Sequence, residues 1–198
     1  MQRRDAIRLL TLAPLGLALV RTAQAKTDAV ADFQQRYGTL KSVDLVFASQ
    51  RISGRLRARL GGLYCIEAGD RQFVCDGHSV WNVQTSTKTV VIDRYVPSNE
   101  LSVDCIFFVL LNVYVPSVKK QGKQTVLRLT PPGADAKIVG VDYADVYLDL
   151  KGAITRIDVN EHGQTTEWTI TKLTRNPKLS DAIFTVASPK GWNVVDLR

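Results

Sequence analysis

The chain has 198 residues, which is the size of one ordinary domain. Hydrophobic residues make up 45% and charged residues 23% of the sequence, and these globular values exclude an intrinsically disordered chain and a multispanning membrane protein. The formal charge is +7, but residues 1–25 hold four Arg and one Asp, so the rest carries 22 basic and 18 acidic residues with no basic block, a weak basis for binding nucleic acid.

Residues 1–25 have the pattern of a cleavable export signal. Arg3 and Arg4 precede an apolar run over residues 9–20, and Ala23-Gln24-Ala25 places small residues where a signal peptidase cuts. The run of 12 residues is shorter than the roughly 20 that a membrane-spanning helix needs. The paired arginines fit a twin-arginine signal and a Sec signal about equally well. Because the cleavage site is not followed by a Cys that could be lipidated, we expect a mature protein that begins at Lys26 and is free in its compartment.

The mature chain opens with the pattern of one amphipathic helix. Val30, Phe33, Tyr37 and Leu40 recur at spacings of three and four, which predicts a helix over residues 28–40 with one apolar face. Short segments that alternate apolar and polar residues follow, and they predict antiparallel strands at residues 43–49, 54–60, 63–67, 72–75, 79–84 and 89–94. Asp76-Gly77 predicts a hairpin turn between two of these strands, because both residue types accept a positive φ.

The middle of the chain breaks this alternation. Residues 103–115 are apolar nearly all round and lie between Pro97 and Pro116. This stretch is too short to cross a bilayer and favours a buried or half-buried helix on the sheet, although its Val content also fits a strand. Strands are predicted again at residues 125–129, 137–139, 143–150, 153–159, 165–173 and 183–186. Without a repeat or a linker, residues 26–198 read as a single, mainly β domain: one curved or partly closed antiparallel sheet with two helical pieces against it.

Three cysteines lie in the exported part of the chain, where thiols can oxidise. Cys65 and Cys75 flank a short polar stretch and are expected on neighbouring strands of one hairpin. A disulfide between them depends on the register, because a slip of one residue places the two side chains on opposite faces. Three buried small residues explain the cysteines equally well, and Cys105 is expected to stay free.

The sequence contains no recognisable catalytic motif. His78 and His162 both stand beside Gly in predicted turns, and no nucleophile motif, phosphate-binding loop or metal-ligand spacing is present. Asp145 and Asp149 alternate with tyrosines as on the polar face of a strand, which we favour over a metal site. The sequence therefore predicts neither an enzyme nor a bound metal or other cofactor.

Three stretches carry a resemblance to a known family. They are Phe33-x-x-x-Tyr37-x-x-Leu40-x-Ser42 running into Val46-Phe47-x-x-Gln50, the hairpin segment Val74-Cys75-Asp76-Gly77-x-x-Val80-Trp81, and Phe184-Thr185-Val186-x-x-Pro189-x-Gly191-Trp192-x-Val194-x-Asp196. Together they resemble LolA, the outer-membrane lipoprotein carriers of the Gram-negative periplasm. Each stretch is moderately specific, and together they extend over most of residues 33–196.

The resemblance implies an unclosed antiparallel β-barrel with a helical lid over a hydrophobic cavity. In such carriers the cavity receives the acyl chains of a lipoprotein, which an inner-membrane transporter releases and an outer-membrane acceptor takes up. The resemblance also assigns to Arg59 the role of the arginine that latches the lid, although Leu60 stands where the family has Pro. A monomeric periplasmic carrier is the function it implies, and a lipid or lipoprotein sensor of the same fold is the alternative.

Large apolar side chains of the predicted strands and helices are the candidates for lining such a cavity. They are Tyr64, Trp81, Ile92, Phe107, Phe108, Leu111, Val146, Leu148 and Trp168. An apolar inner face under a helix is physically a container for an apolar ligand. The same residues also suit a plain core in which the helices fill the curve of the sheet.

Overall fold

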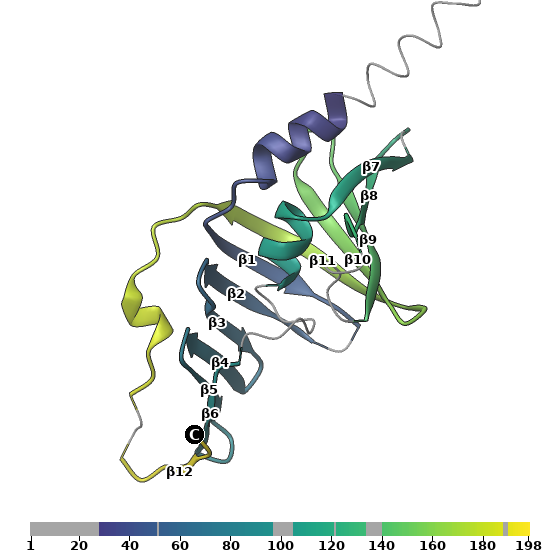
Figure 1. Ribbon diagram of the computed structural model, residues 1–198. Coiled ribbons are helices and arrows are strands. Elements are labelled where there is room, and N and C mark those ends of the chain that lie inside the picture. The colour runs from purple at the N-terminus through teal and green to yellow at the C-terminus, as the bar shows by residue number, and fades with distance from the viewer. Residues whose placement is uncertain (1–27, 51, 97–104, 121, 134–139, 188–189) are drawn as a thin grey trace, which may run out of the picture.

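The computed structural model describes residues 28–50, 52–96, 105–120, 122–133, 140–187 and 190–198. Within these residues, strands far apart in the sequence join into one strongly curved sheet (Figure 1). Its twelve strands are β1 Ser42–Ala48, β2 Ser53–Arg59, β3 Leu63–Ala68, β4 Arg71–Asp76, β5 Ser79–Gln84, β6 Thr89–Arg94, β7 Val115–Lys120, β8 Thr125–Thr130, β9 Val141–Leu148, β10 Ile154–Glu161, β11 Gln164–Arg175 and β12 Asn193–Asp196. The strand content confirms the prediction of a mainly β fold.

Two antiparallel meanders meet at β1 to make this sheet. The strand order is β12-β6-β5-β4-β3-β2-β1-β11-β10-β9-β8-β7, so β1 pairs with β2 on one side and with β11 on the other. Every pairing is antiparallel except that of β12, which lies parallel to β6. Because β12 and β7 are edge strands and do not pair with each other, the barrel is unclosed, as predicted.

Hairpin turns form where glycine was expected to set them. Gly77 takes a φ of +86°, while the Asp76 carboxylate accepts hydrogen bonds of 2.8 Å from the backbone N–H groups of His78 and Ser79. At the β10–β11 turn, His162 and Gly163 both have positive φ, which is the signature of the tight turns that suit the twist of a hairpin.

The N-terminal helix spans residues 28–37 and packs on the concave side of the sheet. Phe33 and Tyr37 are buried one turn apart, with their ring centroids 5.2 Å from each other. The Tyr37 hydroxyl donates to the carbonyl of Gly152 and accepts from the N–H of Ile154, both at 3.2 Å. These bonds attach the helix to the β9–β10 turn, and burial raises the pKa of Tyr37.

The apolar middle segment is helical rather than extended. A π-helical element, η1, covers Cys105–Leu110 and continues as helix over residues 111–112. Phe108, Leu110 and Leu111 join the same buried cluster as the N-terminal helix. The predicted segment extended to residue 115, but Val115 instead begins β7, a strand that the sequence analysis missed.

The C-terminal tail departs from the predicted pattern. Residues 183–186 were expected to form a strand, but a 3-10 helix, η3, covers Asp181–Phe184, and the next strand is β12. Phe184 is buried against β3 and β4. Further along the tail, Val186 and Trp192 pack on Val83, Val90 and Ile92 of the outer face. The strand predicted at residues 137–139 lies outside the described residues.

Cys65 and Cys75 are both buried and are not bonded to each other, so the structure does not form the disulfide that the sequence left open. Cys65 pairs with Val74, and Cys75 pairs with Tyr64. Directly paired residues share a face and neighbours alternate, so the two thiols point to opposite sides of the sheet.

We therefore expect that Cys65 and Cys75 do not form a disulfide with each other after export. Peptide mapping of the unreduced, denatured protein should find no peptide that links Cys65 to Cys75, because their opposite orientations prevent the bond geometry that a disulfide requires. A peptide linking Cys65 to Cys75 would contradict the register.

Candidate functional site

The concave face of the sheet is the largest apolar feature that the fold creates. Where the N-terminal helix and η1 cover it, side chains of β1, β2 and β8–β11 form one buried cluster. Its largest fully buried members are Phe33, Leu40, Leu45, Leu56, Leu110, Leu127, Leu129 and Ile157. This part of the concave face is a packed core.

The same face continues across β3–β6 with less cover. Leu45 of the buried cluster pairs with Leu56, which pairs with Ile66, and Ile66 pairs with Phe73. Because paired residues share a face, this row extends the concave face strand by strand. Apolar side chains along this half are only partly buried: Tyr64, Ile66, Phe73, Val80 and Val91. The concave face thus presents a half-exposed apolar strip beyond the packed core.

The structure brings six of the nine predicted lining residues to the concave side. Phe108, Leu111, Val146 and Leu148 belong to the buried cluster, and Tyr64 and Trp168 pack against it with partial exposure. The side chain of Phe107 lies outside the described residues. Sequence reasoning missed Ile66, Phe73, Val80 and Val91 of the half-exposed apolar strip. The signal that could have found Ile66 is its spacing of two residues from Tyr64.

Trp81 and Ile92 were predicted to line the cavity, and this placement is wrong. The two residues pair with each other on β5 and β6, in a row that runs through Val74 and Cys65. That row faces outward, where the tail residues Val186 and Trp192 cover it. Both residues are apolar because this half of the sheet is covered on its outer side as well. Alternation along a strand does not predict that cover.

Arg59 also lies on the outer face, so the structure does not place it where a latch on the concave side would act. Its neighbour Ala58 is the residue of β2 that points into the buried cluster. The Arg59 guanidinium pairs with Asp181 at 2.7 Å and stands 5.3 Å from the centroid of the Phe184 ring. Arg59 therefore holds η3 of the tail.

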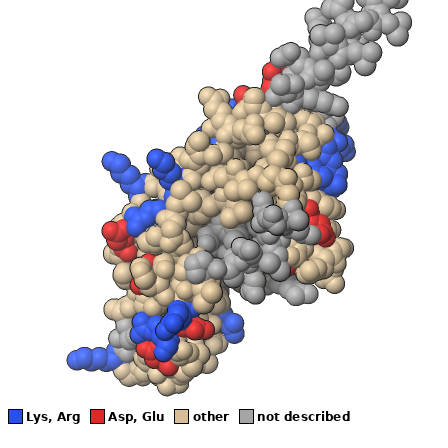
Figure 2. Space-filling model, in the orientation of Figure 1, with Lys and Arg blue, Asp and Glu red and all other residues tan. Residues whose placement is uncertain are grey.

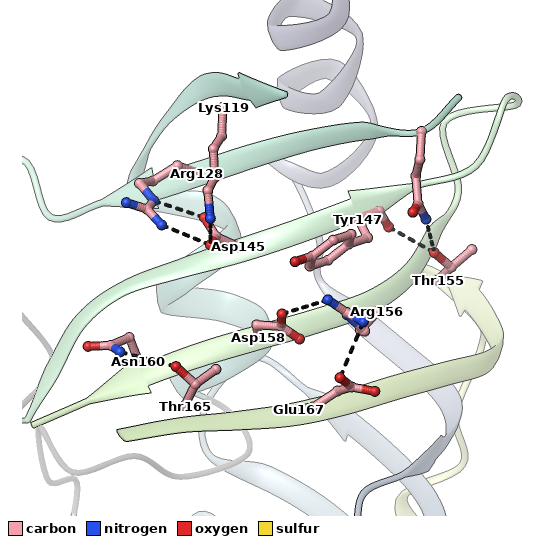
Figure 3. A network of polar contacts seen from close by, with 11 residues as sticks. Lys119, Arg128, Asp145, Tyr147, Thr155, Arg156, Asp158, Asn160, Thr165 and Glu167 are labelled. Atoms are coloured by element: carbon pink, nitrogen blue, oxygen red, sulfur yellow. Dashed lines mark hydrogen bonds and ion pairs between the residues drawn. The ribbon is translucent and has the colours of Figure 1, made fainter. Parts of the chain in front are cut away.

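A polar network occupies the outer face of β8–β11 (Figure 3). Arg156 pairs with Asp158 at 2.9 Å and with Glu167 at 3.2 Å, and its guanidinium lies 3.8 Å from the centroid of the Tyr147 ring. These side chains come from three adjacent strands and bring opposite charges into contact. Within the described part of the chain, no group of three or more His, Cys, Asp or Glu side chains is arranged to hold a metal ion.

A second set of ion pairs on the same face surrounds Asp145, which is buried with 4% of its surface exposed. Arg128 donates two hydrogen bonds of 2.9 Å to its carboxylate, and Lys119 donates one of 2.5 Å. Burial raises the pKa of Asp145, but the bonds from Arg128 and Lys119 outweigh burial and hold that pKa below its ordinary value. The carboxylate therefore stays ionised at neutral pH, and its hydrogen-bond partners Arg128 and Lys119 are both cations.

Charged side chains form separate groups at the margins of the face shown in Figure 2, with uncharged residues between them. Among the described residues in this view, the Lys and Arg side chains do not form one continuous basic patch. Separately, none of the helices in the described ranges combines the length and the apolarity that a membrane crossing requires.

An unclosed antiparallel barrel, with helices against a concave apolar face that continues beyond them, is the class of structure that these residues define. The family model of the outer membrane lipoprotein carrier protein LolA matches residues 27–187. The chain belongs to this family.

A solved structure agrees with this one at the level of the fold. An uncharacterised conserved protein from Thermus thermophilus superimposes with a TM-score of 0.50 at 16% identity, covering 88% of this chain and 99% of that one. An outer membrane lipoprotein-sorting protein domain from Vibrio parahaemolyticus, described as putative, gives a TM-score of 0.38 at 14% identity, covering 82% of this chain and 97% of that one. A search of curated proteins finds no match to the chain.

Asp145→Asn should lower the free energy of unfolding at pH 7 by about 2 kcal/mol, because it removes a carboxylate that accepts three hydrogen bonds from cations. A lowered folded-state pKa means that this stability is present above the unfolded value of about 3.9 and is lost as the pH falls through the folded value. The difference between variant and unsubstituted protein should therefore shrink on acidification below about pH 4.

Urea unfolding between pH 7 and pH 2 measures this difference, and Asp93→Asn, at an exposed position on β6, is the control. A difference that stayed constant down to pH 2 would show that the carboxylate charge is not what stabilises this face.

Proposed function

We propose that the mature protein is a periplasmic carrier that binds the acyl chains of lipoproteins on its concave face and moves them from the inner to the outer membrane. Membership of a family of lipoprotein carriers supports this proposal. The observation that carries it is the apolar strip of β3–β6, which continues the core surface but is only partly buried. Acyl chains are the apolar, extended ligands that such a strip would cover.

The physical basis is the removal of hydrocarbon from water. Burying one methylene contributes ~0.8 kcal/mol, so about ten methylenes per chain offset several kcal/mol of exposure. Release is then the difficult step. A helical cover that packs on the empty face competes with the ligand and moderates its affinity, so the carrier needs no nucleotide of its own. The family resemblance supplies the partners: an inner-membrane transporter that releases lipoproteins and an outer-membrane acceptor.

Export is part of the proposal, and it gives a direct prediction. The N-terminal sequence of protein recovered from the periplasm should begin at Lys26, because Ala23-Gln24-Ala25 offers the small residues that the peptidase needs. A mature end displaced by more than a few residues, or a product that keeps residues 1–25, would refute this expectation.

Phe73→Asp tests the proposed acyl site. Because Phe73 is only partly buried, the new carboxylate stays hydrated and the protein should fold, while its affinity for a fluorescent fatty-acyl probe should fall by about tenfold or more. Val115→Asp is the matched control, since Val115 is 50% exposed on β7 and faces away from the concave side. Circular dichroism and thermal melting establish that both variants are folded.

Phe108→Asp provides the buried comparison. Phe108 is 6% exposed within the packed cluster, so an unpaired carboxylate there should cost several kcal/mol and prevent folding. Equal probe binding by the folded Phe73 and Val115 variants would count against an acyl site on β3–β6. A folded Phe108 variant that binds no probe would instead place the site under the helices.

A further inference from the structure

One hydrogen-bond donor on the concave side has no partner among the described residues. Trp168 lies on β11, opposite Ile157 of β10, and its ring meets that of Phe47 edge-on at 5.5 Å between centroids. All three side chains belong to, or pack against, the concave apolar cluster. The indole Nε1 is buried, and no hydrogen-bond acceptor among the described residues reaches it.

The other buried side-chain atoms without partners in the described ranges have simpler explanations. Arg57, Arg156 and Asp158 are each engaged in ion pairs through their remaining atoms. Asn112 has an unpaired Oδ1, but the two ends of its amide are interchangeable in placement. An indole has one N–H and no such ambiguity, which leaves Trp168 as the donor without a partner.

A buried N–H without an acceptor is unfavourable, because it has lost its bond to water and gained none in return. Phe would fill this apolar position without that cost. Indole rings are normally placed where the N–H can find a partner. A ligand that brings a carbonyl oxygen to the concave face would supply the missing acceptor.

We propose that Trp168 is a specificity-determining residue of the concave face, whose indole N–H donates a hydrogen bond to the carbonyl oxygen of an acyl ester or amide. The inference rests on the proposed function and adds to it the chemical class that the face recognises: acyl groups in preference to plain hydrocarbon. The apolar strip supplies affinity for any long chain, and Trp168 fixes where along the face the carbonyl end of that chain lies.

The test compares two ligands of equal size, methyl laurate and pentadecane, of which only the ester has an acceptor. Each displaces a fluorescent fatty-acyl probe from the mature protein. Trp168→Phe should weaken the binding of methyl laurate by about five- to tenfold and change the affinity for pentadecane by about twofold or less. Only the ester loses a hydrogen bond in this variant. Trp81→Phe, on the outer face, is the matched control and should change the affinity for neither ligand.

Two further readouts separate a hydrogen bond from a packing effect. The ¹⁵N–¹H resonance of the Trp168 indole should shift on addition of methyl laurate and stay nearly in place with pentadecane. The melting temperature of the ligand-free Trp168→Phe variant should match or exceed that of the unsubstituted protein, because the substitution removes an unsatisfied donor.

Each outcome of these measurements supports or overturns the inference on Trp168. Equal weakening of both ligands would assign Trp168 to packing and overturn the inference, while leaving the proposed carrier function in place. Unchanged binding of the ester would also overturn it. If the unsubstituted protein bound neither ligand nor the probe, the proposed function would fail and the inference with it.

Discussion

Antiparallel pairing across one open sheet is the constraint on which the rest of the molecule depends. Each strand pair fixes which residues share a face, and β1 links the two meanders into a single register. The concave row from Leu45 through Leu56 and Ile66 to Phe73 exists only because three successive pairings are in step. A slip of one residue at any of them would turn an apolar row to the opposite face.

The apolar surfaces of the two halves of this sheet are covered in different ways. In β8–β11 the helices bury the concave side, and ion pairs around Asp145 and Arg156 make the outer side polar. In β3–β6 both sides carry apolar residues, and the tail covers the outer side with Phe184, Val186 and Trp192. The described residues therefore cover the outer side of this half, whereas the apolar side chains on its concave side are only partly buried.

Apolar surface alone gives affinity without direction, because the hydrophobic effect scales with area and does not orient a chain. A carrier that must also release its cargo gains little from more of the same surface. One donor among apolar neighbours changes the selectivity at small cost in area, since it acts only on ligands that carry an acceptor. The position of Trp168 beside Phe47, on the strand that pairs with β1, places that donor where the two meanders join.

The sequence by itself determined the local structure of this protein. Alternation with a period of two located most of the strands, Asp76-Gly77 and His162-Gly163 located two hairpins, and the spacing of Phe33 and Tyr37 located the N-terminal helix. The family resemblance supplied the unclosed barrel. These features follow from interactions within a few residues of chain, and those interactions are present in the sequence as patterns.

Only the tertiary structure decided which face each alternating residue occupies. Trp81 and Ile92 have the same pattern as concave residues, yet they face outward because a tail more than ninety residues away covers them. Arg59 meets Asp181 for the same reason, and Cys65 and Cys75 are separated by a register that depends on their neighbouring strands. Periodicity gives the relative parity of residues along one strand, but the absolute side is set by pairing and by distant segments, which no local pattern encodes.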